Sequence, residues 1–473
     1  MLGLLLQAVG GCSHKTTVQD TGTVQDVAVD LLEDQILPDQ AGVDCSSGVT
    51  HAWSKGFGGI YLDNGTSVVA DSNNGTVYVT GVFQDTVDFG GGTIPGSGYD
   101  DIFIASFTSS GVHRWSKALG GDGYDRGADL AVDAAGNIYM TGRLQGSADF
   151  GGGTISASDI FVASFNADGA HRWSKGFGSG TGEGRSVAVD SSGNIYVTGF
   201  RRGTVDFGGG SISGSGYDDI FVASFTSDGD HRWSKVFAAV GEDKGESIAV
   251  DNSGNVFVTG SFFQTVDLGG GVVAGKGGLD IFVASFTSSG AHRWSNGFGG
   301  TSHDQGTDVA VDRSGNVYVT GHFEDSVQFG GEKLIGGGSL DIFVASFDST
   351  GLHRWSKSFG SFALEFGKSV AVDGSGNVYV TGGFVSATDF GCDAIKSNGA
   401  IDVFVVSLTS LGDHRWSMGC GSAWDFDLGI GLALDKHQDV YVTGSFSLGA
   451  DFGGGPLNFV GDRDIFLLKL SQK

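Results

Sequence analysis

Residues 190–199 read DSSGNIYVTG, and close variants of this stretch begin at Asp71, Asp133, Asp251, Asp312, Asp373 and Asp435. Glycine and asparagine at the centre tolerate the positive φ angles of a tight turn. The preceding SVAV (186–189) alternates in the manner of a strand, and IYV (195–197) contains β-branched and aromatic residues that favour strands. The stretch therefore predicts a β-hairpin, and the sequence contains it seven times.

Two more strands follow each hairpin. In the third unit they are DIFVASF (219–225) and HRWSK (231–235). A similarity that returns at a fixed period is typical of repeat architectures, and four short strands alone would leave both sheet faces wet. Radial stacking covers those faces, so the sequence predicts an all-β, seven-bladed β-propeller with four antiparallel strands per blade. The tryptophans of the fourth strand recur every 58 to 62 residues, at Trp53, Trp115, Trp173, Trp233, Trp294, Trp355 and Trp416.

The ends of the repeat region predict how the ring closes. A tryptophan strand at 51–55 precedes the first hairpin, and the last unit ends at DIFLL (464–468) without one. We therefore expect the N-terminal strand 51–55 to close the last blade as its outermost strand, which removes exposed sheet edges. The small-residue strands, of the SVAV type, would line the central channel. In the alternative phase the DIFVA-type strand is innermost, and residues 464–470 complete the ring.

Composition excludes several classes of protein. The 473 residues include 85 glycines and 3 prolines without a triplet period, which excludes collagen. A hydrophobic content of 40% is too high for a disordered glycine-rich chain. The net charge of −27 repels phosphate backbones, so we expect no nucleic-acid partner and interpret the charge mainly as a contribution to solubility.

The N-terminal region predicts export. Residues 1–11 are largely apolar and end in VGG before Cys12, which resembles a bacterial lipobox. That resemblance implies a lipoprotein-type signal peptide at 1–11, lipidation of Cys12, and anchoring to the cell envelope, at the outer membrane or the cell surface. No basic residue precedes Cys12, although export signals usually have one, so either the true start lies upstream or the match is accidental. Residues 12–50 are acidic and lack aromatic residues, which predicts a flexible tether before a propeller at 51–473.

The remaining cysteines are Cys45, Cys392 and Cys420. Cys392 and Cys420 flank one blade and can form a disulfide in an oxidising compartment, while Cys45 paired with Cys420 is the alternative. The sequence does not choose between them. No CxxC motif or histidine pair lies nearby, so we predict no metal site and no cofactor.

The repeat units, and residues 190–199 above all, resemble the bacterial β-propeller repeat family known as SBBP. The resemblance covers about residues 51–473, and the inner hairpin is also similar to that of NHL propellers. It implies exported or surface proteins, many of them lipoproteins, without a defined activity, and it transfers no catalytic motif. Residues 223–233 also match the spacing of the quinoprotein tryptophan-docking motif, but Phe225 and Asp228 replace the expected Asp and Thr, which argues against a quinone.

Residues that recur in every blade indicate architecture. This applies to the His and Arg beside each tryptophan, and to the turn aspartates, which offer too few carboxylates for a calcium shell. Function is expected where the repeat varies, in the loops between the tryptophan strand and the next inner strand. The candidate ligand-binding residues are Tyr61, Asp63, Tyr124, Asp125, Arg126, Asp243, His303, Asp304, Glu365, Phe366, Trp424, Asp425 and Asp427. The same loops also contain Asp122, Glu183, Arg185, Glu242, Lys244 and Phe362.

Catalysis has little support in the sequence. Asp425 and Asp427 can in principle act as a glycosidase pair, and His303 with Asp304 as a base and its orienting group. The chain lacks a nucleophile elbow, an HExxH motif and a Walker loop. We therefore predict a non-catalytic, monomeric, lipid-anchored binding or scaffold module whose partner is an envelope protein or a glycan. The alternatives are a carbohydrate-binding or carbohydrate-active protein that uses the variable loops, and an envelope-assembly scaffold similar to the propeller lipoprotein of the outer-membrane barrel-assembly machine.

Overall fold

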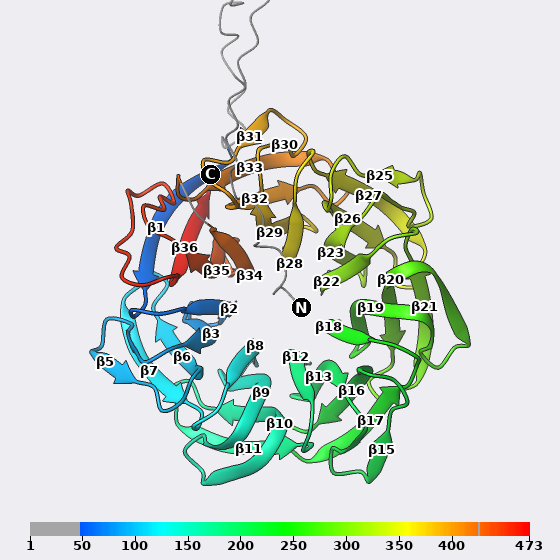
Figure 1. Cartoon of the computed structure of the whole chain (residues 1–473), viewed down its shortest axis with the longest axis horizontal. Coiled ribbons are helices and arrows are strands. Elements are labelled where there is room, and N and C mark those ends of the chain that lie inside the picture. Colours follow the sequence, from blue (N-terminus) through cyan, green and yellow to red (C-terminus); the bar gives the residue numbers. More distant parts are fainter. Residues whose placement is uncertain (1–47, 424–425) are drawn as a thin grey trace, which may run out of the picture. The chain divides into compact units, whose positions relative to one another are not determined.

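Seven four-stranded antiparallel sheets stand around a common axis in the computed structural model of this chain (Figure 1). The structure describes residues 48–423 and 426–473, so Cys12, Cys45, Trp424, Asp425 and the predicted signal peptide and tether lie outside the described residues. The predicted all-β, seven-bladed propeller is confirmed. Within the described ranges, no helix has the length and apolarity needed to cross a bilayer.

The blades follow one another in sequence, and their strands run from the axis outward. Blade 1 contains β2 (Asn64–Ala70), β3 (Val77–Phe83), β6 (Asp101–Phe107) and β7 (His113–Leu119). Blade 2 contains β8 (Arg126–Val132), β9 (Ile138–Asp149), β10 (Thr154–Phe165) and β11 (His171–Phe177). Blade 3 contains β12 (Gly182–Val189), β13 (Ile195–Arg201), β16 (Asp219–Phe225) and β17 (His231–Phe237). Blade 4 contains β18 (Lys244–Val250), β19 (Val256–Asp267), β20 (Val272–Phe286) and β21 (His292–Phe298).

The later blades repeat this order. Blade 5 contains β22 (Asp304–Val311), β23 (Val317–Phe323), β26 (Asp341–Phe347) and β27 (His353–Phe359). Blade 6 contains β28 (Phe366–Val372), β29 (Val378–Phe384), β32 (Asp402–Leu408) and β33 (His414–Cys420). Blade 7 contains β34 (Leu428–Leu434), β35 (Val440–Phe446), β36 (Asp464–Gln472) and β1 (Val49–Phe57).

The glycine-rich stretches between the second and third strands form ribbons on the outside of the blades (Figure 1). Blades 2 and 4 build theirs as extensions of β9 with β10 and of β19 with β20. The separate ribbons are β4 (Thr86–Asp88) with β5 (Thr93–Pro95), β14 (Thr204–Asp206) with β15 (Ser211–Ser213), β24 (Ser326–Val327) with β25 (Leu334–Ile335), and β30 (Ala387–Asp389) with β31 (Ala394–Lys396).

The ring closes as predicted. β1 pairs antiparallel with β36, and the register places Lys55 opposite Leu467 and Phe57 opposite Ile465. The strand at the start of the propeller is therefore the outermost strand of blade 7, drawn in blue beside red in Figure 1. The small-residue strands β2, β8, β12, β18, β22, β28 and β34 lie closest to the axis. The alternative phase, with the Asp-Ile-Phe strand innermost, is wrong.

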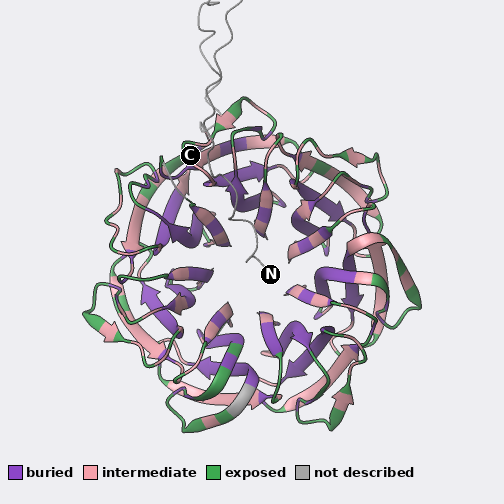
Figure 2. Ribbon diagram, in the orientation of Figure 1, coloured by how far each residue is buried: buried purple, intermediate pink, exposed green. Residues whose placement is uncertain are grey.

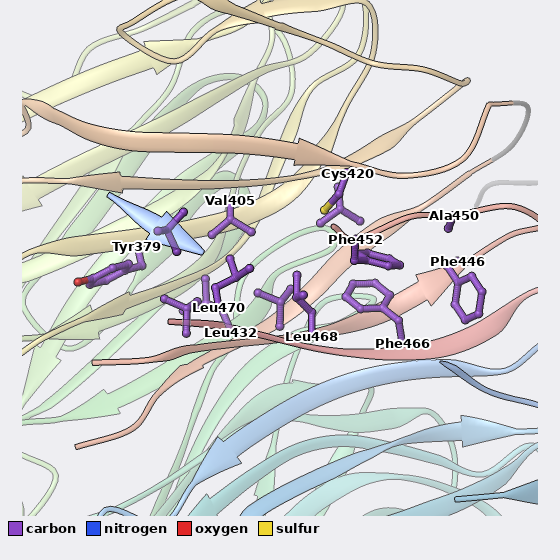
Figure 3. Packing of buried hydrophobic residues seen from close by; sticks show 14 of the residues in the cluster. Tyr379, Val405, Cys420, Leu432, Phe446, Ala450, Phe452, Phe466, Leu468 and Leu470 are labelled. Carbon is purple, nitrogen blue, oxygen red and sulfur yellow. The ribbon is translucent and has the colours of Figure 1, made fainter. Parts of the chain in front are cut away.

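The hydrophobic core lies between neighbouring blades. Because the third strand of a blade has a sheet on both sides, all seven residues of β16 are buried, whereas the outer strands are half-buried (Figure 2). Figure 3 shows this packing between blades 6 and 7, where Phe452 and Phe466 stack with ring centroids 4.4 Å apart. Full burial of one such side chain contributes about 1.5–3 kcal/mol.

Cys420 belongs to this same core cluster and is a free, buried thiol (Figure 3). It lies opposite Val403 in the sheet and packs with the phenylalanines of blade 7. Both disulfides considered for Cys420, with Cys392 or with Cys45, are therefore wrong, because its side chain points into the interior between two blades. Cys392 is itself disulfide-bonded.

Each tryptophan joins its blade to the next one. The indole N–H of Trp233 donates to the carbonyl of Ser288, in the turn between the third and fourth strands of blade 4, at 2.9 Å. The same contact closes the ring, since Trp53 donates to Ser109 of blade 1 at 3.2 Å. Gly290 has a φ of 82°, and a Cβ at this position would lie 2.8 Å from the Trp233 ring. Both the backbone angle and the space beside the ring therefore require glycine.

The other recurring residues have structural partners, as predicted. His231 Nε2 lies 3.1 Å from Ser234 Oγ in the same strand. The guanidinium of Arg232 lies over the ring of Tyr196, 5.6 Å from its centroid. Asp190 accepts four hydrogen bonds of 2.8–2.9 Å from the backbone and side chains of its own turn and from Tyr196, so turn chemistry occupies its oxygens.

Candidate functional site

The loops that join a tryptophan strand to the next inner strand all emerge at one end of the propeller. The antiparallel order dictates this, because every blade starts and finishes at the same end. We call this end the loop face. Isolated bridges tie the loops to the segment before a third strand, as between Asp100 and Tyr124 and between Leu340 and Leu364. The variable loops therefore lie together around the mouth of the channel.

The acidic candidates of these loops point inward. Asp63, Asp125, Asp243, Asp304, Glu365 and Asp427 are all buried. Asp63 accepts hydrogen bonds from the backbone N–H of Gly59 at 2.5 Å and of Gln84 at 2.9 Å. Asp304 does the same with Gly300 at 2.6 Å and Glu324 at 3.1 Å. Each carboxylate thus fixes its loop to the end of a second strand.

Burial outweighs these hydrogen bonds and raises the pKa of the loop carboxyls. It raises the pKa of Asp63 and of Asp304 to about 7, and that of Asp243 and of Asp427 to about 6. A second carboxylate adds to the effect, since Asp464 of the neighbouring blade raises the pKa of Asp63 further. The loop face therefore carries a set of internal carboxyls that titrate near neutral pH.

Blade 3 departs from this arrangement. Gly182 occupies the position of the loop aspartate, and β13 ends in Arg201 where β3 ends in Phe83. The buried Arg201 guanidinium forms an ion pair with Asp159 of blade 2. In blade 3 the Arg201 guanidinium thus takes the place of the loop carboxylate. It holds the loop through its ion pair with Asp159.

The loop face also exposes large apolar and aromatic side chains. Phe362 is 95% exposed, and Tyr124 is 49% exposed and stacks on Tyr99 with ring centroids 4.9 Å apart. The exposed large apolar residues of the loops and of the segments before the third strands are Ile60, Tyr61, Leu62, Tyr99, Tyr124, Tyr217, Val240, Phe362, Leu364, Phe426 and Val460. We call this set the apolar rim. Large apolar side chains that gather on one exposed surface are typical of an interaction site.

The remaining candidates do not assemble a catalytic pair in the described residues. The side chain of His303 is 65% exposed and approaches Glu324 at 4.0 Å, while the Asp304 carboxylate binds backbone amides. The carboxylate of Asp427 accepts from the backbone N–H of Ser422 and of Ser447. Arg126 and Phe366 begin the inner strands β8 and β28, at the channel. The pair of Asp425 with Asp427 cannot be placed, because Asp425 lies outside the described residues.

The central channel contains a cavity of about 250 Å³ that all seven inner strands line. Hydrogen bonds across neighbouring blades form a polar belt around part of it. Asp129 accepts from Ser67 Oγ at 2.7 Å and from Ser186 Oγ at 2.8 Å. Asp308 accepts from Ser247 Oγ at 2.5 Å and from Ser369 Oγ at 2.8 Å. Each of these aspartates thereby joins three blades.

The chain offers no evident metal centre, since no group of three or more His, Cys, Asp or Glu side chains in the described ranges is arranged to hold an ion. The polar belt explains why its two aspartates do not form one. Their oxygens accept from serine hydroxyls and from the backbone amides of residues such as Val187 and Val370. These carboxylates are therefore structural.

The β-propeller repeat SBBP matches four segments of the chain, which are residues 173–199, 233–261, 294–322 and 355–382. An uncharacterised WD repeat-containing protein of Acanthamoeba polyphaga mimivirus is 20% identical over 86% of this chain, and the match covers 36% of that protein. The regulatory protein FlaEY of Caulobacter vibrioides is 26% identical over 41% of this chain and 21% of its own length. The chain thus spans about a third or less of these curated relatives.

Among solved structures, the chain is similar to the WD40 domain of Pan2 from Neurospora crassa. The TM-score is 0.44 at 9% identity, over 85% of this chain and 88% of that domain. A luciferin-regenerating enzyme has a TM-score of 0.34 at 9% identity, over 87% of this chain and 92% of that one. The calcium-binding protein regucalcin from Agrobacterium tumefaciens has a TM-score of 0.33 at 8% identity, over 73% of this chain and 91% of that one.

Proposed function

The chain is a seven-bladed propeller that carries SBBP repeats, and from this premise we propose that it is a non-catalytic module that binds a partner protein through its loop face. The apolar rim supports this proposal most directly. Its side chains sit on loops whose backbones are held by buried carboxylates such as Asp63 and Asp304, so little loop entropy is lost on binding. A rigid apolar surface with aromatic anchors is what protein interfaces require.

The test uses exposed apolar residues at the two ends of the propeller. Phe362 and Tyr61 belong to the rim, whereas Leu352 and Leu411, each 67% exposed, lie in turns at the opposite end. The paired change Tyr61→Ser with Phe362→Ser is expected to abolish capture of envelope proteins by the immobilised full chain. The paired change Leu352→Ser with Leu411→Ser is the control and should leave capture unchanged. Equal capture by both variants would contradict the proposal.

A glycan is the second candidate ligand. Tyr99 and Tyr124 present a stacked, exposed pair on the loop face, and exposed tyrosine rings offer the apolar face and polar tip that a sugar needs. Glycan-array binding that disappears in Tyr124→Ala and persists in Tyr61→Ser would favour this function. Turnover of a polysaccharide would instead support a carbohydrate-active enzyme.

We further propose that the module is exported and anchored to the cell envelope by a lipid on Cys12. The support is the lipobox-like sequence before Cys12 and the acidic segment up to residue 50, which suits a spacer. Metabolic labelling with palmitate should mark the full chain, and the label and the membrane fraction should both be lost in Cys12→Ser. Membrane association that survives in Cys12→Ser would rule out this anchor.

A further inference from the structure

Five charged side chains from four blades line the loop-face mouth of the channel. They are Arg126 of blade 2, Glu183 and Arg185 of blade 3, Glu246 of blade 4 and Lys368 of blade 6, and all except Glu183 line the cavity. No single blade could form this cluster, because its members come together only when the ring is closed. It is also unusual for this chain, whose net charge is −27.

The acidic members of the cluster already have partners. Arg185 lies 3.6 Å from a Glu183 oxygen and 3.8 Å from a Glu246 oxygen, and Gln305 donates to Glu246 at 3.1 Å. One residue deeper, Asp129 and Asp308 are occupied by the serine hydroxyls and backbone amides of the polar belt. Each of these four carboxylates therefore already has an ion-pair or hydrogen-bond partner within the wall.

Two cations remain without a carboxylate. Within the described residues, neither Arg126 nor Lys368 has an acidic oxygen within 4.0 Å, and the buried Nε of Arg126 has no hydrogen-bond partner. Lys368 Nζ lies over the ring of Phe366, 5.1 Å from its centroid. Burial lowers the pKa of Lys368 most, the Glu246 carboxylate raises it in part, and Arg185 and Arg126 lower it again, so the three cations lie close enough to interact.

We propose that the mouth of the central channel is a binding site for a small oxyanion, held between Arg126, Arg185 and Lys368. The guanidinium groups offer planar N–H pairs that match a carboxylate or a phosphate, and the ammonium adds a compact charge. The hydroxyls of Thr66 and Thr307 line the same cavity but already donate to the carbonyls of Gly127 and Gly367, so the three cations alone hold the anion. The cavity of about 250 Å³ admits a free anion or a small organic acid.

An oxyanion would remove the repulsion among these cations, which are partly desolvated before it binds. The acidic exterior does not prevent its entry at physiological salt, because charges more than about 8 Å away are largely screened. The proposed anion site lies in the channel and does not include the apolar rim. Anion binding therefore does not depend on the partner protein proposed above.

The experiment is a calorimetric titration of the full chain at pH 7 and 150 mM KCl, with inorganic phosphate in one arm and malonate in the other. We expect one site per chain, with at least a tenfold loss of affinity in Lys368→Met and in Arg126→Gln. The matched control is Lys333→Met, on an exposed ribbon residue, and it should bind as the wild type does. The arm that gives the tighter binding identifies the class of anion.

Folding of the variants is checked by heating in the absence of anion. Because Lys368 is a charge held in a desolvated wall, Lys368→Met should melt no lower than the wild type, and anion should raise the melting temperature of the wild type but not of Lys368→Met. Lys368→Arg keeps the charge and should retain binding. Wild-type affinity in both Lys368→Met and Arg126→Gln, or no heat with either anion, would overturn the proposal.

Discussion

Lys469 donates from Nζ to Asp439 at 2.8 Å, and this ion pair in blade 7 replaces an arginine that the other blades carry on their outer strand. In blade 5 the outer-strand Arg354 lies over the ring of Tyr318 at 5.8 Å and donates to Ser346. In blade 7 the outer strand has Ala52 at that position. Lys469 stands where the other blades have the serine, and its ammonium lies 5.0 Å from the centroid of the Tyr441 ring. Blade 7 therefore carries this cation on its third strand instead of its fourth, and the cation still lies over the tyrosine ring of the second strand.

The first prediction tests this exchange. Lys469→Ser should lower the free energy of unfolding by about 2–4 kcal/mol, because it leaves the buried Asp435 and its neighbour Asp439 without their cation. Adding Ala52→Arg should recover more than half of that loss by restoring the arrangement of the other blades. Urea denaturation followed by tryptophan fluorescence gives the double-mutant cycle. Simply additive effects would mean that the two positions are independent.

The second prediction concerns pH. Since burial raises the pKa of Asp63 and of Asp304 from 3.8 to about 7, the folded state favours their protonated form. Their contribution to stability is therefore complete below pH 3.8 and is lost as the pH rises through about 7, by at most about 1.4 kcal/mol per pKa unit for each group. The urea midpoint should be lower at pH 8 than at pH 5.

A matched pair of variants identifies the source of that slope. Asp304→Asn removes a buried titrating group and should flatten the dependence of the urea midpoint between pH 5 and 8. Asp122→Asn changes an exposed loop aspartate and should leave the dependence as it is. An unchanged slope in Asp304→Asn would show that Asp304 does not contribute to the pH dependence.

The third prediction separates backbone strain from packing in the tryptophan contacts. Gly203 and Gly290 have φ angles of 77° and 82°, but a Cβ meets nothing within 4 Å at Gly203 and lies 2.8 Å from Trp233 at Gly290. Gly203→Ala should lower the free energy of unfolding by about 1–2 kcal/mol, because a residue with a Cβ disfavours the left-handed backbone. Gly290→Ala should cost about 1–3 kcal/mol more, because the indole must shift. Equal losses in chemical denaturation would show that the indole adapts freely.

The fourth prediction concerns the free thiol. Because burial raises the pKa of Cys420 and closes it off from solvent, the thiol should react with Ellman's reagent only after unfolding. Cys420→Val should be tolerated, whereas Cys420→Ser should cost about 1–3 kcal/mol by leaving a hydroxyl in an apolar cluster. Rapid labelling of the folded chain at this position would contradict the packing between blades 6 and 7.

The sequence predicted the fold well because each repeat contains one complete blade. The position of the tryptophan strand at 51–55, ahead of any hairpin, was enough to predict closure by β1, which the structure confirms. Side-chain direction in the loops was not predictable. The loop carboxylates look like surface groups in sequence, yet Asp63 and Asp304 turn inward to bind backbone amides.

Part of the charged channel mouth was also visible in sequence, and part was not. Arg126, Glu183 and Arg185 are among the loop residues that the sequence predicts, whereas Glu246 and Lys368, on the inner strands β18 and β28, are not among the predicted residues. A signal existed. The residue after the recurring strand glycine is of six different types in the seven blades, and it faces the cavity. In the order of the blades the residues are Thr66, Ala128, Arg185, Glu246, Thr307, Lys368 and Ile430. A position that varies within an otherwise uniform repeat is not needed for the fold, so it is a candidate position for ligand binding.

The pairing of β1 with β36 has a consequence for biosynthesis. A ribosome makes β1 before any blade and β36 after six of them, so β1 waits without its neighbour while about four hundred residues are added. Blades 1 to 6 can stack as they appear, but the first has an open flank until the last is complete. Final assembly therefore depends on the contact of greatest sequence separation, which makes it the slow and vulnerable step. A nascent chain halted before residue 464 would expose both β1 and the flank of blade 1, which are suitable sites for a chaperone to protect.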